Sequence, residues 1–249
     1  MEQQPKILCV IPSRLNSTRL PRKPLVLIGN KPMIQWVYEA ACQCVAFSKV
    51  IVATDSEEIE EVIKKLGGHV EMTPSELPTG TDRVACIAKK YPEYDVVVNL
   101  QGDEPFIKPE MLVSLVSPYL NGINPAMATL ACPLNLEKEY NDPNTVKVIY
   151  NKLNHAIYFS RSPIPYFRQQ NIENVPILMH LGLYAFTRKF LLEYTQMEQT
   201  PLEKSELLEQ LRAVENGVSI YVSQTPHRII EINYPEDLEN ARKYVEELK

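Results

Sequence analysis

Short apolar runs alternate with amphipathic segments through the first half of the chain. Runs rich in β-branched residues are typical of strands buried on both faces of a parallel sheet. Proline lacks a backbone N–H to donate, so Pro12 is predicted to end the first run. We predict strands at residues 7–11, 49–54, 70–72, 95–100 and 127–132.

Between these strands, apolar residues recur with helical spacing, as Met33, Ile34, Val37 and Ala41 do. Helices are predicted at residues 32–45, 56–66, 79–91 and 109–120, the second with a capping box from Asp55 and Glu58 and the third with Thr79 or Thr81 as its cap. The repeated alternation indicates an α/β fold with a doubly wound, mostly parallel sheet and helices on both faces.

The pattern changes after residue 133. Strands are predicted at 145–150, 179–186, 218–222 and 228–232, a proline-punctuated extended segment at 157–166, and helices at 201–216 and 235–247. We interpret residues 133–186 as a smaller, inserted β-rich subdomain that binds a second substrate and contributes to dimerisation. It lies within a single domain of residues 1–249.

Charge and cysteine usage narrow the class of protein. The 26 basic and 31 acidic residues give a net charge of −5, which argues against a general nucleic-acid binder. The five cysteines form no C-x-x-C and are typical of a reducing compartment. No charged leader and no run of 18 apolar residues occurs, so we expect a cytoplasmic protein.

A basic loop follows the first strand and carries Arg14, Arg19, Arg22 and Lys23. Ligands of open α/β sheets bind beyond the carboxyl ends of strands, so this loop is placed to receive an anion, most simply phosphate. Neither glycine-rich phosphate motif is present, because no glycine precedes Gly29. The alternative is an ordinary solvated basic loop.

Two further stretches follow predicted strands. Asp103 and Glu104 come after the strand at 95–100, where carboxylates beside phosphates would suit Mg²⁺, although acidic pairs also occur in plain turns. The segment from Thr79 to Arg83 opens a helix whose free N–H groups can hold a base or phosphate, or it merely starts the helix.

The pattern I-P-x-R-x-x-S-T-R-L-P-x-K-P-L at residues 11–25 resembles the opening of sugar-acid cytidylyltransferases, most closely the 3-deoxy-manno-octulosonate (Kdo) cytidylyltransferases. Six more stretches follow in that family's order, the last of them P-E-D-L ending at Leu238, so the resemblance covers nearly the whole chain. The other five lie between residues 78 and 212. They are P-T-G-T-D-R ending at Arg83, N-L-Q-G-D-E-P ending at Pro105, Y-F-S-R-S-P-I-P ending at Pro165, H-L-G from His180 and L-E-Q-L-R ending at Arg212.

The resemblance implies a nucleotide-diphospho-sugar transferase-like fold. The implied activity is transfer of CMP from CTP to the anomeric hydroxyl of Kdo for lipopolysaccharide synthesis, with Mg²⁺ as cofactor and a homodimer as the assembly. Arg14, Lys23 and Asp103 would be catalytic, with Asp103 holding the metal. The implied nucleotide contacts are Pro12, Ser13, Arg14, Arg19, Lys23, Thr79, Gly80, Arg83 and Gln101.

For the acceptor, the resemblance implies Arg161, His180, Glu209 and Gln210. From the residues alone, a single histidine near an apolar strand is usually structural, and that is the alternative for His180. For Glu209 and Gln210 the default interpretation is a solvated helix face.

Two positions depart from the family pattern. Arg22 stands where the family usually has glycine, and Asn233 stands where it has its second metal-ligand aspartate. Asn233 also lies just before Pro235, where it would qualify as a helix cap. Two alternatives stay open: the same reaction on an amino-substituted Kdo or a nonulosonic acid, and a nucleotide-binding regulator without turnover.

Overall fold

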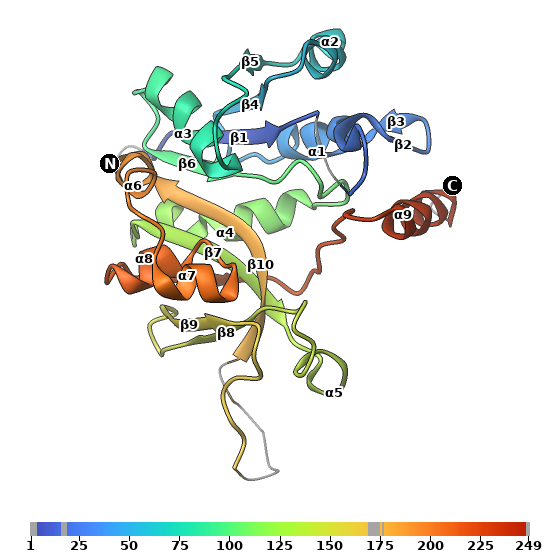
Figure 1. The fold of residues 1–249 in the computed structure, drawn as a ribbon. Helices are drawn as coiled ribbons and strands as arrows, with labels where there is room; N and C mark the ends of the chain where they lie inside the picture. The colour runs from blue at the N-terminus through green and yellow to red at the C-terminus, as the bar shows by residue number, and fades with distance from the viewer. Residues whose placement is uncertain (1–3, 16–18, 169–174, 176, 248–249) are drawn as a thin grey trace. The chain divides into compact units, whose positions relative to one another are not determined.

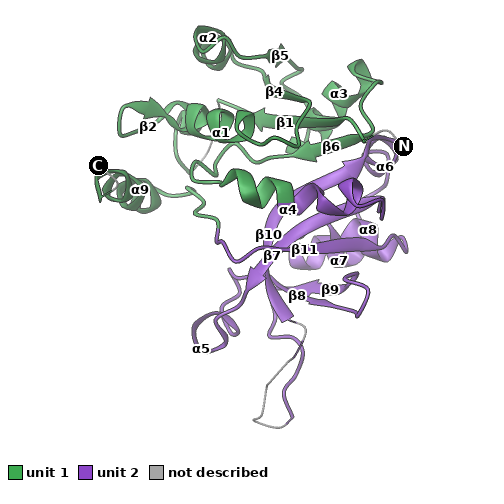
Figure 2. Cartoon of the chain, turned by 180° about the vertical axis from the view of Figure 1, so that it is seen from behind, with its two compact units in different colours: residues 1–113, 229–249 green, residues 114–228 purple. Residues whose placement is uncertain are grey.

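The computed structural model describes residues 4–15, 19–168, 175 and 177–247. The chain forms two compact units (Figure 2), one made of residues 1–113 and 229–249 and the other of residues 114–228. The predicted insertion at 133–186 falls within the second unit. Its residues 169–174 and 176 lie outside the described part of the chain, as do residues 16–18 of the basic loop. Among the described residues, no helix is long and apolar enough to cross a membrane.

A parallel sheet organises the first unit. β1 (Ile7–Ser13) lies between β6 (Val96–Asn99) and β4 (Lys49–Thr54), and β4 also pairs with β5 (Val70–Met72). The connections α1 (Met33–Cys42) and α2 (Glu57–Lys65) step outward from β1 to β5, whereas α3 (Gly80–Lys90) returns to β6 (Figure 1). Right-handed crossovers therefore place α3 on the opposite face of this sheet from α1 and α2.

These strands and helices confirm the predicted alternation, with one correction at Pro12. β1 does not stop there but continues to Ser13. The backbone groups of Val10 point toward β6, because the Val10 carbonyl oxygen accepts from Leu100 N. Pro12 lies two residues further along the strand, so its nitrogen points to the same side. Pairing with β6 ends at Val10 and Asn99, so the missing proline N–H leaves no ladder hydrogen bond unmade.

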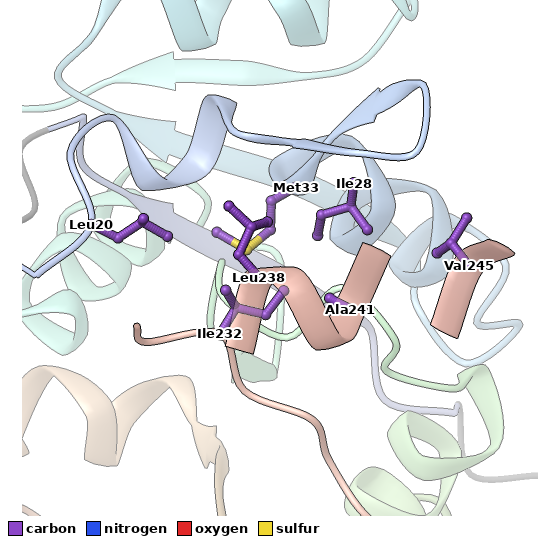
Figure 3. Close-up of a cluster of buried hydrophobic side chains, with 7 residues drawn as sticks. All are labelled: Leu20, Ile28, Met33, Ile232, Leu238, Ala241 and Val245. Carbon is purple, nitrogen blue, oxygen red and sulfur yellow. The ribbon is translucent and has the colours of Figure 1, made fainter. Parts of the chain in front are cut away.

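The C-terminal helix α9 (Pro235–Glu247) begins and ends where predicted. It packs on the N-terminal segment that contains the 3₁₀ helix η1 (Lys23–Leu25) and the short pair β2 (Leu27–Ile28) and β3 (Lys31–Pro32). Figure 3 shows the shared core of buried side chains. Its members are Leu20, Ile28, Met33, Ile232, Leu238, Ala241 and Val245.

The second unit has a mixed sheet. β7 (Met127–Pro133) pairs in parallel with β11 (Ile220–Gln224) and antiparallel with β10 (Ile177–Thr187). β10 also pairs antiparallel with β8 (Lys147–Tyr150), which pairs with β9 (Ala156–Ser160). The helices α5 (Leu136–Glu139), α6 (Arg188–Tyr194), α7 (Pro201–Glu206) and α8 (Leu211–Glu215) are short, whereas α4 (Pro109–Leu120) crosses the boundary between the units along the chain.

Three predicted elements are wrong. The helix at 201–216 divides into α7 and α8, because Leu207 adopts a left-handed conformation with φ of 53°. Residues 228–232 form no strand, and Ile232 N donates to a loop carbonyl, that of Asp103. The capping box at α2 does not form, because Asp55 and Glu58 pair with arginines.

Candidate functional site

A pocket in the first unit lies beyond the carboxyl ends of β1 and β6. It brings together six of the predicted residues, Pro12, Ser13, Arg14, Lys23, Gln101 and Asp103, and is completed by Pro24, Met33 and Gly102. The loop after β1 and the loop after β6 therefore meet, as the parallel pairing of the two strands requires.

Close backbone approach shapes this pocket. A Cβ atom added to Gly102 would lie 3.2 Å from the carbonyl oxygen of Pro12, so glycine lets the two loops touch. The buried hydroxyl of Ser13 has no hydrogen-bond partner among the described residues. Because buried polar groups are normally paired, this hydroxyl is available to a ligand.

Lys23 is the centre of a polar network in the pocket. Its Nζ donates to Asp103 Oδ2 at 2.7 Å and to Asn233 Oδ1 at 3.0 Å, and its side chain is only 13% exposed. An ammonium has three donors, and the third has no partner among the residues that the structure describes. Lys23 can therefore hold a carboxylate and a bound anion together.

Two glutamates adjoin this network: Glu104, which the sequence pairs with Asp103 as a candidate carboxylate, and Glu231, which the sequence analysis does not name. Glu104 is buried, and loss of solvent together with the charges of Asp103 and Glu231 raises its pKa well above the usual value. The pKa of Glu231 is also raised, first by loss of solvent and then by Asp103. Glu231 Oε2 accepts from Asn233 Nδ2 at 3.0 Å. The only sequence signal for Glu231 is its place two residues before Asn233.

The side chain of Asn233 does not cap α9. Asp237, in the first turn of α9, reaches back instead, and its Oδ2 accepts from the backbone N–H groups of Asn233 at 2.9 Å and Tyr234 at 2.8 Å, as the acidic residue of a capping box does. The Asn233 amide instead bridges Lys23 and Glu231. The departure from the family pattern therefore lies inside the pocket network.

The other loop cations separate from Lys23. Arg14 lines the pocket and donates to the carbonyl oxygen of Leu77. Arg19 lies over the ring of Tyr234, with its Cζ 5.6 Å from the ring centroid. Arg22 forms an exposed ion pair with Glu58 of α2 and has a φ of 55°. Glycine adopts this left-handed conformation without strain, which explains the family's usual glycine there.

We expect Arg22→Gly to be more stable than Arg22→Ala by about 1 kcal/mol. Both variants lose the exposed ion pair, which contributes little, but only alanine keeps the steric cost of the left-handed conformation. Urea unfolding of the two variants measures the difference. Equal stability would mean that the loop relaxes out of this conformation when the arginine is removed.

The Thr79 and Gly80 turn starts α3 beside β1. Thr79 is the N-cap and forms a capping box with Asp82, each side chain accepting from the other's backbone N–H at 3.1 Å. A Cβ atom on Gly80 would lie 3.4 Å from the ring of Pro12. This turn packs against Pro12, although it does not line the pocket.

Arg83 is fully buried one turn into α3. It donates to Asp55 Oδ2 at 2.9 Å and to the hydroxyl of Thr73, and its Nε has no partner among the described residues. Burial lowers its pKa, and the charge of Asp55 opposes that shift. The guanidinium joins α3 to the segments after β4 and β5, so its predicted contact with a nucleotide stays a prediction.

In the second unit, His180 is a buried, neutral residue of β10. Burial lowers its pKa to about 3. Its Nε2 lies 2.9 Å from Thr129 Oγ1, and that hydroxyl donates to Leu183 O at 2.8 Å. The hydroxyl must then accept from Nε2–H, which leaves Nδ1 as a hydrogen-bond acceptor.

The pKa of His180 predicts an acid-dependent loss of stability. The folded pKa lies below the unfolded value of about 6.5, so the full contribution is present above pH 6.5. Between pH 6.5 and 3, His180 is protonated in the unfolded chain but not in the native chain. The free energy of unfolding therefore falls by up to about 1.4 kcal/mol for each pH unit in this range. Unfolding by urea at several pH values should show a shallower dependence for His180→Gln than for the parent. Parallel curves would contradict the buried neutral state.

Glu209 and Gln210 lie in the turn between α7 and α8. Gln210 is buried, so the solvated-face interpretation is wrong for it. Its Oε1 accepts from Tyr184 OH at 2.8 Å, and its Nε2 has no partner among the described residues. Tyr194 OH donates to the Glu209 carbonyl at 2.6 Å. The amide is thereby oriented to offer a donor.

Arg161, just after β9, is held on two sides. Its Nε donates to Glu206 O at 2.8 Å and its NH1 to Pro143 O at 3.0 Å. Its backbone N–H donates to Glu206 Oε2 at 2.9 Å. Within the described chain, no hydrogen bond uses its NH2, which remains as a donor for a carboxylate.

Comparison with known proteins adds independent findings. The cytidylyltransferase family model matches residues 8–220. A protein of Acaryochloris marina named 3-deoxy-manno-octulosonate cytidylyltransferase is 53% identical over 241 residues, which cover 97% of this chain and 98% of that protein. A namesake from Synechococcus elongatus is 44% identical over 96% of this chain and 98% of its own. A solved structure of CMP:2-keto-3-deoxy-manno-octonic acid synthetase complexed with CTP matches with a TM-score of 0.92 and 39% identity, over 98% of this chain and 100% of that one.

Proposed function

This chain belongs to the 3-deoxy-manno-octulosonate cytidylyltransferase family, and we propose that it transfers CMP from CTP to the anomeric hydroxyl of Kdo. The observation that carries the proposal is the pocket beyond β1 and β6, where Lys23 and Asp103 form an ion pair beside Ser13 and Arg14. Cations, a carboxylate and a free hydroxyl at this edge of the sheet suit a nucleoside triphosphate.

The reaction forms a bond from the acceptor hydroxyl oxygen to the α-phosphorus and breaks the bond to the pyrophosphate leaving group. The hydroxyl proton is released, and the products are CMP-Kdo and pyrophosphate. Such a transfer depends on positioning and on neutralising developing charge. The third donor of Lys23, together with Arg14, would bind the phosphates and stabilise charge on the leaving group.

Cytidylyltransferases generally use a divalent metal ion, and we propose Mg²⁺ for this chain. No group of three or more His, Cys, Asp or Glu side chains that could hold a metal occurs in the described part of the chain. The residues fit the other mode of Mg²⁺ binding, in which one or two carboxylates share the ion with substrate phosphates and water. Asp103, with Asn233 or Glu231 beside it, would hold the ion, which neutralises phosphate charge when bound.

The acceptor site is proposed from residues of the second unit. The NH2 of Arg161 would bind the acceptor carboxylate. His180 Nδ1 would accept from a hydroxyl, and Gln210 Nε2 would donate to one. The neutral state of His180 supports a contact with a hydroxyl, because an uncharged imidazole offers little to a carboxylate.

The family resemblance also supports a homodimer, a cytoplasmic location and a role in lipopolysaccharide synthesis, which we include in the proposal. The acceptor segment at residues 133–186 is part of it as well. An amino-substituted Kdo or a nonulosonic acid is the alternative acceptor.

Pyrophosphate release tests the proposed function. We expect release with CTP, Mg²⁺ and Kdo, and much less when ATP or GTP replaces CTP. In a thermal shift experiment, CTP should stabilise the fold by about 2.7 kcal/mol at a hundredfold excess over its dissociation constant. Equal shifts with all three nucleotides would contradict the cytidine assignment. CTP binding without release for any acceptor would favour a regulator.

The effect of restoring the family aspartate can be measured with Asn233→Asp. The variant places a carboxylate where an amide now donates to Glu231, so it should be less stable than the parent without a divalent ion. With Mg²⁺, the added hard ligand should lower the concentration that gives half-maximal pyrophosphate release. Coincident Mg²⁺ titration curves would show that residue 233 does not contact the metal.

A further inference from the structure

Lys147 is a lysine without any exposed surface, in β8 of the second unit. Lysine is almost never fully buried without a partner, because removing an ammonium from water is costly. Its three donors all reach backbone carbonyl oxygens, those of Thr145 at 2.7 Å, Asp142 at 2.9 Å and Arg161 at 2.5 Å. A buried ammonium with all its donors used acts as a fixed internal cation.

These carbonyls belong to two separate segments. Asp142 and Thr145 lie in the loop before β8, and Arg161 follows β9. The NH1 of Arg161 donates to Pro143 O, between the two loop residues that Lys147 binds. Lys147 therefore joins the loop that supports the guanidinium to the backbone that carries it.

Glu206 holds the same arginine from α7. Its carboxylate accepts from Arg161 N at 2.9 Å and from Ser160 Oγ at 2.6 Å, while its carbonyl accepts from Nε at 2.8 Å. Lys147 and Glu206 together fix the backbone of Arg161 and two nitrogens of its guanidinium. Among the described residues, NH2 makes no hydrogen bond, so its donors stay available.

We propose that Lys147 is a positioning residue that sets the orientation of the Arg161 guanidinium for the carboxylate of the acceptor. This inference rests on the proposed function, in which Arg161 binds that carboxylate. Bidentate recognition requires the planar guanidinium to be oriented before binding. Lys147 acts through Arg161 and does not touch the acceptor.

The test compares Michaelis constants in the full-length protein. Lys147→Met keeps the side-chain length but removes the ammonium, so the three hydrogen bonds that tie the loop to the end of β9 are lost, and the Arg161 NH1 bond to Pro143 O holds the loop alone. We expect the KM for Kdo to rise about tenfold, a typical loss for one charge-assisted contact. The KM for CTP should stay within about twofold, because the proposed function assigns Arg161 to the acceptor and not to the nucleotide. A rise in both constants, or in neither, overturns the proposal.

A second variant covers the outcome in which Lys147→Met fails to fold. Lys147→Arg keeps the charge but spreads it over a planar group that cannot place three donors of one nitrogen on three carbonyls. We expect a folded protein whose KM for Kdo rises about threefold, with the KM for CTP unchanged. An unchanged KM for Kdo in this variant contradicts the proposal by itself.

Two controls separate positioning from general destabilisation and from failure of the proposed function. Leu191→Ala removes a buried side chain of α6 in the same unit and should lower the urea concentration at the midpoint of unfolding, without raising the KM for Kdo. In an Arg161→Gln background, Lys147→Arg should have no further effect on that constant. If Arg161→Gln alone leaves the KM unchanged, the acceptor contact itself is wrong. Pyrophosphate release by the parent protein establishes the reaction in either case.

Discussion

Lys23→Ala should lower kcat for CMP transfer by about 10²-fold or more. Removing a single donor to charge that develops in the transition state costs roughly this much in other enzymes. Lys23 is placed for such a role, because its ammonium is tied to Asp103 at 2.7 Å and to Asn233 at 3.0 Å while one donor stays unused among the described residues. Steady-state pyrophosphate release measures the effect. A fall of less than threefold would show that the Lys23 pocket is not the catalytic phosphate site.

The same substitution should also lower stability, by about 1–3 kcal/mol. The side chain is largely buried, and its loss leaves Asp103 without its cation. The free energy of unfolding should therefore be measured alongside kcat. Arg22→Ala is the matched control, because Arg22 is the neighbouring loop cation, points to Glu58 and does not line the pocket. Its kcat should stay within about twofold of the parent's.

Arg83→Met should lower the free energy of unfolding by about 3 kcal/mol. Removing one partner of a buried ion pair leaves the other charge uncompensated, and Asp55 is only 16% exposed. Methionine keeps most of the side-chain volume, so the cost reflects charge more than a cavity. Urea unfolding measures it, and Asp55→Asn in the same background should recover part of the loss.

Lys90→Met is the matched control on the same helix. Lys90 pairs with Glu71 on the surface, where its side chain is 47% exposed, so its loss should cost no more than about 1 kcal/mol. If Arg83→Met lowered the free energy of unfolding no more than Lys90→Met does, but raised the KM for CTP, the main role of Arg83 would be to contact the nucleotide. A large stability loss with an unchanged KM would make its role structural.

The sequence predicts the first unit well because its signals are local. Each buried strand is a continuous apolar run, and each crossover helix has its own apolar stripe. The position of the basic loop and of Asp103 beyond neighbouring strands follows from parallel pairing alone. β1 continues past Pro12 because its pairing with β6 has already ended there, and the end of β6 cannot be predicted from the sequence around Pro12.

The network around Lys23 could not be predicted in the same way. Lys23 contacts residues 80 and 210 positions away, and nothing local relates Asn233 and Glu231 to it. The spacing of Leu207, Leu208 and Leu211 predicts one helix, yet Leu207 turns left-handed and brings Gln210 into the interior. Lys147 and Glu206 carry no motif at all. Their roles depend on burial, and charged residues are usually exposed, so a sequence gives no sign that these two are buried.

The first unit contains both ends of the chain, so its two parts are synthesised at different times. Residues 1–113 leave the ribosome long before residues 229–249. During that time the apolar side chains of Leu20, Ile28 and Met33 are not covered by α9, which supplies the other side of the cluster. Transiently exposed apolar surface of this kind invites aggregation. Asn233 arrives in the same last segment, just ahead of the helix that covers the core. The chain can therefore add Asn233 and Glu231 to its pocket network, and bury this apolar cluster, only after the second unit has been synthesised.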